Sequence, residues 1–322
     1  MATRPRTSRL RRALLAALVA ASVAVPVSGA AGPAAVPAPA PAELGPLGPA
    51  TDAALDERYA AGRADILAAE RTAAVHGDRR RAAVLRAMAD PGRRFLSFDG
   101  RDGGRTAEVF GDLAHAEHIA VLVPGSDTSL DSYGRFGAGA EALRRELGDG
   151  AAVIAWLGYK TPGTVSRHIV TDRSAAAAAP GLAHFVRELT SSRPGSRMTL
   201  LCHSYGAVVC GLAAADLPVA DIVLYGSPGT GARDVESLRT RATVWAGRGA
   251  DDWIADVPHR RLDLGFVTVG FGTDPVSPSF GARVFDAGPG GHSDYLRPGS
   301  VPLRNLARIV RGHALSTEPG HA

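Results

Sequence analysis

The chain has 322 residues and a formal net charge of +4, but its first thirty residues hold five arginines and no acidic residue. The rest of the chain therefore carries a net charge of −1, which argues against a nucleic-acid partner, because such proteins keep a basic surplus on the folded domain. Its two cysteines and ten histidines show no metal-ligand spacing, so we expect no metal site.

Residues 1–30 have the pattern of an export signal peptide, with a basic start, an apolar stretch over 13–27 and small residues at 28–30. A retained membrane anchor is the alternative, but the apolar stretch is shorter than the roughly 20 residues that a spanning helix needs. We therefore expect cleavage near Ala30, a secreted or extracytoplasmic protein on the cell-wall side, and no stable membrane insertion. The pair Arg11-Arg12 leaves the twin-arginine route open beside the general one.

The segment before the core divides into two parts. Residues 31–49 are rich in alanine and proline, which predicts a linker. Residues 50–92 form a predicted helical segment, in which Leu55 to Met88 has the periodicity of two amphipathic helices. The basic run Arg79 to Arg81 is more typical of a solvated helix face than of a binding patch.

From residue 93 to 315 short apolar runs alternate with glycine-rich turns and helical stretches, and residues 316–322 remain as a tail. This alternation predicts an α/β domain with a mostly parallel central sheet covered by helices on both faces. We expect eight strands, RFLSF, RTAEVFG, HIAVLVPG, AAVIAWLGY, MTLLCHS, ADIVLYGSPG, ATVWAGRG and FVTVGFG, and helices at Asp131 to Leu147, Ser174 to Leu189 and Leu303 to Ala314.

The fifth predicted strand leads through His203-Ser204-Tyr205-Gly206 into the small-residue stretch AVVCGLAAA. A buried strand that feeds a helix through so tight a corner is typical of the nucleophile elbow, where strained backbone projects a serine hydroxyl above the sheet. The elbow pattern G-x-S-x-G asks for small residues on both sides of the serine, and here Gly206 fits while Cys202 replaces the first glycine. Ser204 is therefore the predicted nucleophile.

A triad requires an acid and then a histidine after the later strands. Asp252 is the predicted acid because it has the D-x-I form, and the adjacent Asp251 stays as the alternative. His292 is the predicted base, since it lies in the loop GPGGHSDYL beyond the predicted eighth strand. The other histidines after the acid lie before that strand, at the end of the closing helix and in the tail: His259, His313 and His321.

An oxyanion hole needs two backbone N–H groups directed at the developing negative charge. By position, Tyr205 after the nucleophile supplies one, and Ser126 in the loop after the third strand supplies the other, with Gly125 allowing the turn.

The two cysteines flank the elbow. A disulfide is conceivable in an exported protein. However, a strand end and a position two turns into the next helix usually lie too far apart for the required Cα separation of about 4.4 to 6.8 Å. We therefore expect Cys202 and Cys210 to be buried small side chains without a bond between them.

No lid domain is expected, because only Gly229 to Thr240 separates the sixth strand from the seventh, which leaves room for a turn and one short helix. The pocket is instead expected to be walled by the loop Gly158 to Asp172 and by the long segment 271–291, partly ordered against the sheet edge. An uncovered nucleophile favours short, soluble acyl groups.

With these residues identified, the chain resembles the α/β-hydrolase superfamily, and more closely a largely uncharacterised family of α/β-hydrolases from high-GC Gram-positive bacteria. The matching motifs cover the chain from Arg93 onward: FLSFD, VLVPG, HSYG, GTDP with FGARVF, and HSDYL. The resemblance implies the α/β-hydrolase fold and a triad of Ser204, Asp252 and His292, and it implies no particular substrate.

The resulting prediction is a secreted serine hydrolase that acts on small-molecule carboxylic esters by acyl transfer and needs no cofactor. The same triad would serve an amidase, a peptidase or an acyltransferase, and the same fold would serve a non-catalytic secreted or cell-wall-associated binding module. The complete triad favours the enzyme, because a binding module has no reason to retain serine, acid and histidine each at its own strand end.

Overall fold

The computed structural model describes residues 36–163, 173–257, 262–263, 268–269 and 271–313. The predicted signal peptide and its cleavage site, the first residues of the linker, the tail, His259 and His321 lie outside these residues, so those predictions stay predictions. Among the described helices, none combines the length and the apolar character that crossing a bilayer requires.

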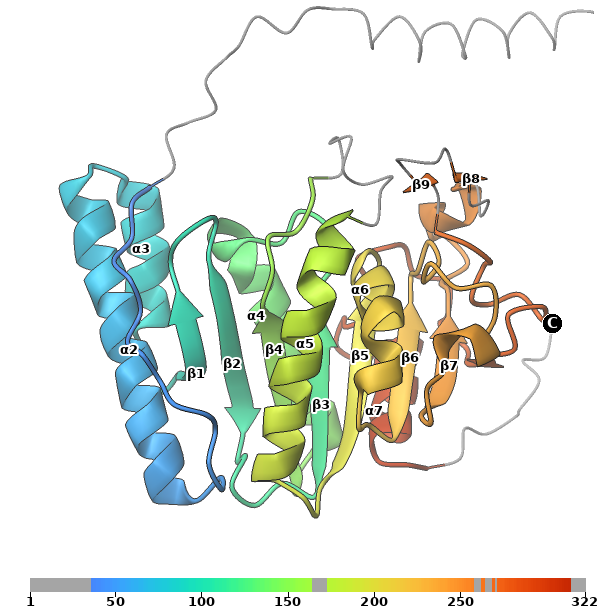
Figure 1. Cartoon of the computed structure of the whole chain (residues 1–322), viewed down its shortest axis with the longest axis horizontal. Coiled ribbons are helices and arrows are strands. Elements are labelled where there is room, and N and C mark those ends of the chain that lie inside the picture. The colour runs from blue at the N-terminus through green and yellow to red at the C-terminus, as the bar shows by residue number, and fades with distance from the viewer. Residues whose placement is uncertain (1–35, 164–172, 258–261, 264–267, 270, 314–322) are drawn as a thin grey trace, which may run out of the picture. The chain divides into compact units, whose positions relative to one another are not determined.

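An eight-stranded sheet forms the centre of the domain, in the order β1-β2-β4-β3-β5-β6-β7-β10 (Figure 1). Strand β2 is antiparallel to both of its neighbours, β1 and β4. The other adjacent pairs are parallel, as predicted. The strands are β1 (Arg94–Asp99), β2 (Arg105–Gly111), β3 (His118–Val123), β4 (Ala151–Leu157), β5 (Arg197–His203), β6 (Asp221–Tyr225), β7 (Thr243–Gly247) and β10 (Arg283–Val284).

Helices cover both faces of this sheet. Helices α5 and α6 lie on the face toward the viewer in Figure 1, and α4 and α7 lie behind it. Successive side chains of a strand point to opposite faces, so Ile119, Val121 and Val123 of β3 join the core beneath α5 and α6, while Ala120 and Leu122 join the core on the other side. The helices are α4 (Tyr133–Leu147), α5 (Arg173–Ser192), α6 (Gly206–Ala213) and α7 (Val301–Val310).

The predicted N-terminal helix pair is present as α2 (Asp52–Val75) and α3 (Arg79–Met88), packed beside β1 (Figure 1). The prediction that the basic run 79–81 is solvated is wrong for Arg81, which is 8% exposed. Its guanidinium donates to both carboxylate oxygens of Asp131, at 2.6 and 2.9 Å. A buried arginine needs such a partner, and the two residues join α3 to the short helix η1 (Leu130–Ser132).

The predicted eighth strand of the sheet, FVTVGFG, is wrong. Its residues in β9 (Thr268–Val269) pair instead with β8 (Leu262–Asp263) in a separate two-stranded antiparallel sheet. The eighth strand of the central sheet is β10, which runs parallel to β7 and lies within the segment 271–291. Both residues of β10 are exposed, so no apolar pattern marks this strand in the sequence. The expectation that the segment is partly ordered against the sheet edge is confirmed.

The connection between β6 and β7 is short, as predicted. Its helical element is the three-residue helix η4 (Glu236–Leu238), and residues 226–242 contain no lid domain. The carboxyl ends of β5, β6 and β7 therefore meet without an inserted domain after β6, and this edge is where parallel α/β sheets place their ligands.

Candidate active site

Ser204 lies at a strained corner between β5 and α6. Its φ is +52°, in the left-handed region that residues with a side chain rarely adopt. The turn is fixed by the Ser204 N–H, which donates to the carbonyl of Tyr225 at the end of β6 (3.1 Å). Gly206 allows the helix to start so close to the sheet, because a Cβ there would lie 2.6 Å from the carbonyl oxygens of Val123 and Pro124. The sequence thus builds the predicted elbow.

The structure brings the three predicted triad residues together from separate loops. The Ser204 hydroxyl lies 2.9 Å from Nε2 of His292, and Nδ1 of the same ring lies 2.8 Å from Oδ1 of Asp252. Ser204 is 7% exposed and Asp252 is 2% exposed, so the chain of hydrogen bonds is largely shielded from water. This arrangement permits a proton to pass from the serine to the histidine while the carboxylate holds the ring.

Asp252 rather than Asp251 faces the histidine. Asp251 is exposed, whereas Asp252 is buried and accepts further hydrogen bonds from the backbone N–H of Ile254 (2.9 Å) and from the hydroxyl of Tyr295. Burial alone would raise the pKa of Asp252, but the bonds from His292, Tyr295 and Ile254 outweigh burial and lower it. Asp252 is therefore ionised at neutral pH.

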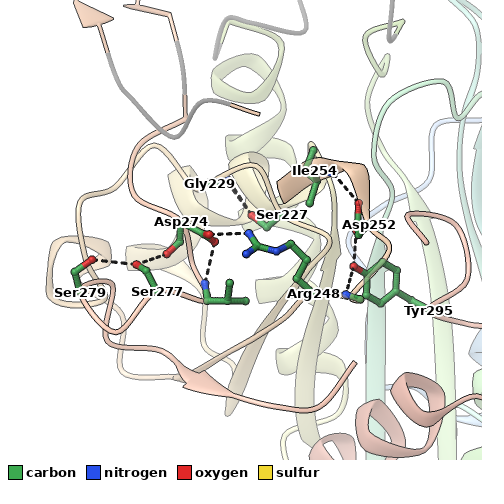
Figure 2. A network of polar contacts seen from close by, with 11 residues as sticks. Ser227, Gly229, Arg248, Asp252, Ile254, Asp274, Ser277, Ser279 and Tyr295 are labelled. Carbon is green, nitrogen blue, oxygen red and sulfur yellow. Dashed lines mark hydrogen bonds and ion pairs between the residues drawn. The ribbon is translucent and has the colours of Figure 1, made fainter. Parts of the chain in front are cut away.

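Figure 2 shows how the loop that carries Asp252 is held in place. Tyr295 donates its hydroxyl proton to Asp252 and accepts from the N–H of Gly249 at 3.0 Å. Burial, and then the bond to Asp252, raise the pKa of Tyr295 far above its ordinary value, so the phenol remains a donor. Arg248 forms an ion pair of 2.6 Å with Asp274, which fixes the segment 271–291 to the end of β7.

His203 is a second histidine at the site, and no role was predicted for it. Its Nε2 lies 2.9 Å from the backbone carbonyl of His292, and the two rings lie 4.8 Å apart. Burial, and then the neighbouring His292, lower the pKa of His203 from 6.5 to about 3. The neutral ring donates its Nε2 proton to the carbonyl, so the residue before Ser204 holds the loop that carries His292.

We expect His203→Gln to make the folded protein less sensitive to acid. In the unfolded chain His203 binds a proton below about pH 6.5, whereas in the folded protein it does so only near pH 3. Its contribution to the free energy of unfolding therefore falls as the pH drops from about 6.5 toward 3. Glutamine keeps an N–H donor and does not titrate. Urea unfolding at pH 7 and pH 5 should show wild type losing roughly 1 to 2 kcal/mol more than the variant, and equal losses would contradict this expectation.

The loop that carries Ser126 lies directly against Ser204. A Cβ at Gly125 would lie 2.6 Å from Cβ of Ser204, so only glycine fits there. The hydroxyl of Tyr159 donates to the carbonyl of Pro124 (2.6 Å), which ties the start of the predicted wall loop 158–172 to this turn. Residues 164–172 of that loop lie outside the described residues. Tyr205, the other predicted oxyanion residue, precedes α6 at the elbow.

Cys202 and Cys210 form a disulfide, so the prediction of two unbonded side chains is wrong. Their Cα atoms lie 6.4 Å apart, within the usual range. The expectation was that a strand end and a position two turns into the next helix lie too far apart. Instead α6 starts immediately after the elbow and packs back along β5, which brings its second turn over Cys202.

Other groups of polar side chains lie apart from the triad. The carboxylates of Asp52 and Asp112 and the imidazole of His115 lie within 4.8 Å of one another, and all three residues are exposed. A surface hollow of about 410 Å³ is lined by α6 and the β6–β7 connection, including Thr230 and Arg239. Neither feature contains a predicted site residue.

A family model described as alpha/beta hydrolase matches residues 99–261, about half of the chain. The chain belongs to the α/β-hydrolase family. The predicted fold class is therefore confirmed by the strand order and by the family match together.

Curated relatives come from mycobacteria. The chain is 31% identical over 255 residues to an uncharacterized protein of Mycobacterium tuberculosis, covering 68% of this chain but only 38% of that relative's length. It is 35% identical over 178 residues to an uncharacterized protein of Mycobacterium bovis, covering 48% of this chain and 66% of the relative. These relatives agree with the predicted resemblance to a family of high-GC Gram-positive bacteria.

Among solved structures, one similar chain is from Xanthomonas campestris and is described as an α/β serine hydrolase without lid. It is 18% identical, with a TM-score of 0.45, and the match covers 70% of this chain and 96% of that one.

Proposed function

We propose that this protein is a serine hydrolase that cleaves small carboxylic esters by acyl transfer through Ser204. The observation that carries the proposal is the hydrogen-bonded chain from Ser204 through His292 to Asp252, at 2.9 and 2.8 Å, with the serine on a strained elbow. Strain of this kind persists at functional sites where the surroundings enforce it.

In the first half-reaction Oγ of Ser204 attacks the ester carbonyl carbon while Nε2 of His292 takes the hydroxyl proton. Asp252 holds the ring through Nδ1 and stabilises the imidazolium. As the tetrahedral intermediate collapses, the bond to the alcohol oxygen breaks and His292 gives its proton to that oxygen. A water molecule then repeats the sequence on the acyl-enzyme, which releases the acid and restores the serine.

The negative charge of the tetrahedral intermediate is assigned to the backbone N–H groups of Ser126 and Tyr205. The closeness of Gly125 to Ser204 supports this assignment, because Ser126 directly follows Gly125 in the chain. The short β6–β7 connection leaves the nucleophile without a lid there, which supports a preference for short, soluble acyl groups.

The proposal includes export. The apolar stretch with a basic start in residues 1–30 and the disulfide between Cys202 and Cys210 both support it, because disulfides persist in oxidising compartments.

A fluorophosphonate probe tests the proposed function directly, because it reacts with an activated serine and forms a stable adduct. We expect labelling of the full chain at a single site, located by peptide mass spectrometry at Ser204. The Ser204→Ala variant should not be labelled, and Ser293→Ala, which changes a serine beside the base, should be labelled as wild type. A native protein that resists the probe, or a variant that still reacts, would contradict the proposal.

A further inference from the structure

Trp253 is an exposed aromatic side chain that lies against the histidine of the triad. It directly follows Asp252 and begins the short helix η5 (Trp253–Asp256). Because the Asp252 carboxylate accepts from the N–H of Ile254, the acid turns inward while Trp253 points outward. The indole ring lies 4.7 Å from the His292 ring, and Trp253 is 48% exposed.

The two aromatic neighbours of His292 differ in their surroundings. His203 lies in a cluster with the buried rings of Tyr225 and Tyr295, at 5.0 and 5.7 Å, and it bonds to the His292 backbone. The ring of His292 is therefore held from the protein side by His203 and by Asp252. Trp253 adds an exposed apolar surface beside the His292 ring, which His203 and Asp252 already hold in place.

The chemistry places the leaving group next to that surface. His292 must return its proton to the alcohol oxygen, so this oxygen comes within about 3 Å of Nε2. The buried aromatic cluster packs against the histidine, and the exposed indole is the apolar surface on its solvent side, so we expect the carbon chain on that oxygen to lead outward along the indole. The acyl group starts from the carbonyl carbon, and its oxygen is assigned above to the N–H groups of Ser126 and Tyr205, which belong to other loops than Trp253.

We infer that Trp253 forms the binding surface for the alcohol part of the substrate, and that the enzyme acts on esters whose alcohol carries an apolar or aromatic group. This inference rests on the proposed ester hydrolysis through Ser204. Each CH₂ that the indole covers removes apolar area from water, which raises kcat/KM by up to about fourfold. A benzyl or hexyl group gains most, and a methyl group gains nothing.

The test compares two series of esters with the full chain, with acid release followed in a pH-stat. One series holds the acid as acetate and varies the alcohol through methanol, butanol, hexanol and benzyl alcohol, which as primary alcohols are similar leaving groups. The other series holds the alcohol as methanol and lengthens the acid from acetate to hexanoate. For wild type, kcat/KM should rise at least tenfold from methyl to hexyl acetate.

Trp253→Ala should lower kcat/KM for hexyl and benzyl acetate far more than for methyl acetate, and it should lower kcat/KM by one common factor for all acids of the methyl-ester series. Trp253→Phe should restore part of the rise. The control is Val75→Ala, which shortens an apolar side chain that is 90% exposed at the end of α2 and should change neither series.

Three results would overturn the inference. An equal loss on all esters, including methyl acetate, would assign Trp253 to positioning His292, and a changed dependence on acid length would place the acyl group on the indole. Wild type without activity on either series would remove the ester hydrolysis on which the inference rests. In that case, fluorophosphonate labelling of Ser204 would show an active nucleophile whose substrate is not one of these esters. The absence of labelling would contradict the proposed function itself.

Discussion

Asp252→Asn is expected to lower kcat about 10³- to 10⁴-fold, as removal of the acid's charge does in other triads. The carboxylate accepts on Oδ1 from His292 and Ile254 and on Oδ2 from Tyr295. An amide offers one oxygen and one NH₂ group, so at least one of these donors meets another donor. The imidazolium also loses the negative charge that stabilises it. The step in which His292 takes the serine proton therefore becomes slower.

The matched control is Asp251→Asn, which makes the same chemical change one residue earlier. Asp251 is exposed, so we expect less than a twofold change in kcat. Initial rates on a soluble acetate ester at pH 8, with thermal unfolding to confirm that both variants fold, would measure the difference. The assignment of the acid is wrong if Asp251→Asn is the variant that loses activity.

The central strands and the elbow could be predicted because their constraints are local. Strands buried on both faces of a parallel sheet are continuous apolar runs, and β3 to β7 have this form in the sequence. The corner at Ser204 requires small neighbours on a strand-to-helix junction, and Gly206 and the following alanine-rich stretch show that requirement directly. The order serine, acid and histidine along the chain then predicted Asp252 and His292 as the other two triad residues.

The features that could not be predicted depend on how distant segments meet. Strand β10 is two exposed residues that gain their place only by pairing with β7. The contacts of His203 and Tyr295 depend on the path of the loop after β10, which brings the His292 carbonyl to His203 and the Tyr295 phenol to Asp252. Both residues stand close to triad members in the chain, in HSYG and HSDYL, and polar aromatic residues at such positions were a signal that sequence reasoning left unused.

Replacing both Cys202 and Cys210 by alanine is expected to lower the free energy of unfolding by roughly 2 to 3 kcal/mol. The disulfide closes a loop between residues eight apart in the chain, and Ser204 lies inside that loop. In the usual account the crosslink restricts the unfolded chain, so its loss increases the entropy gained on unfolding. Guanidinium unfolding of oxidised wild type and of the double variant, both without reductant, would measure the effect.

The same measurement in reductant separates the crosslink from the packing of the two sulfurs. Both cysteines are fully buried, so the native bond is shielded, but once the chain unfolds at equilibrium a thiol reductant opens it. Under those conditions the unfolded wild-type chain is no longer restricted by the crosslink. The difference in free energy of unfolding between wild type and the double variant should then fall to the contribution of side-chain packing, less than about 1.5 kcal/mol. If the full difference remains in reductant, packing rather than the crosslink stabilises the elbow.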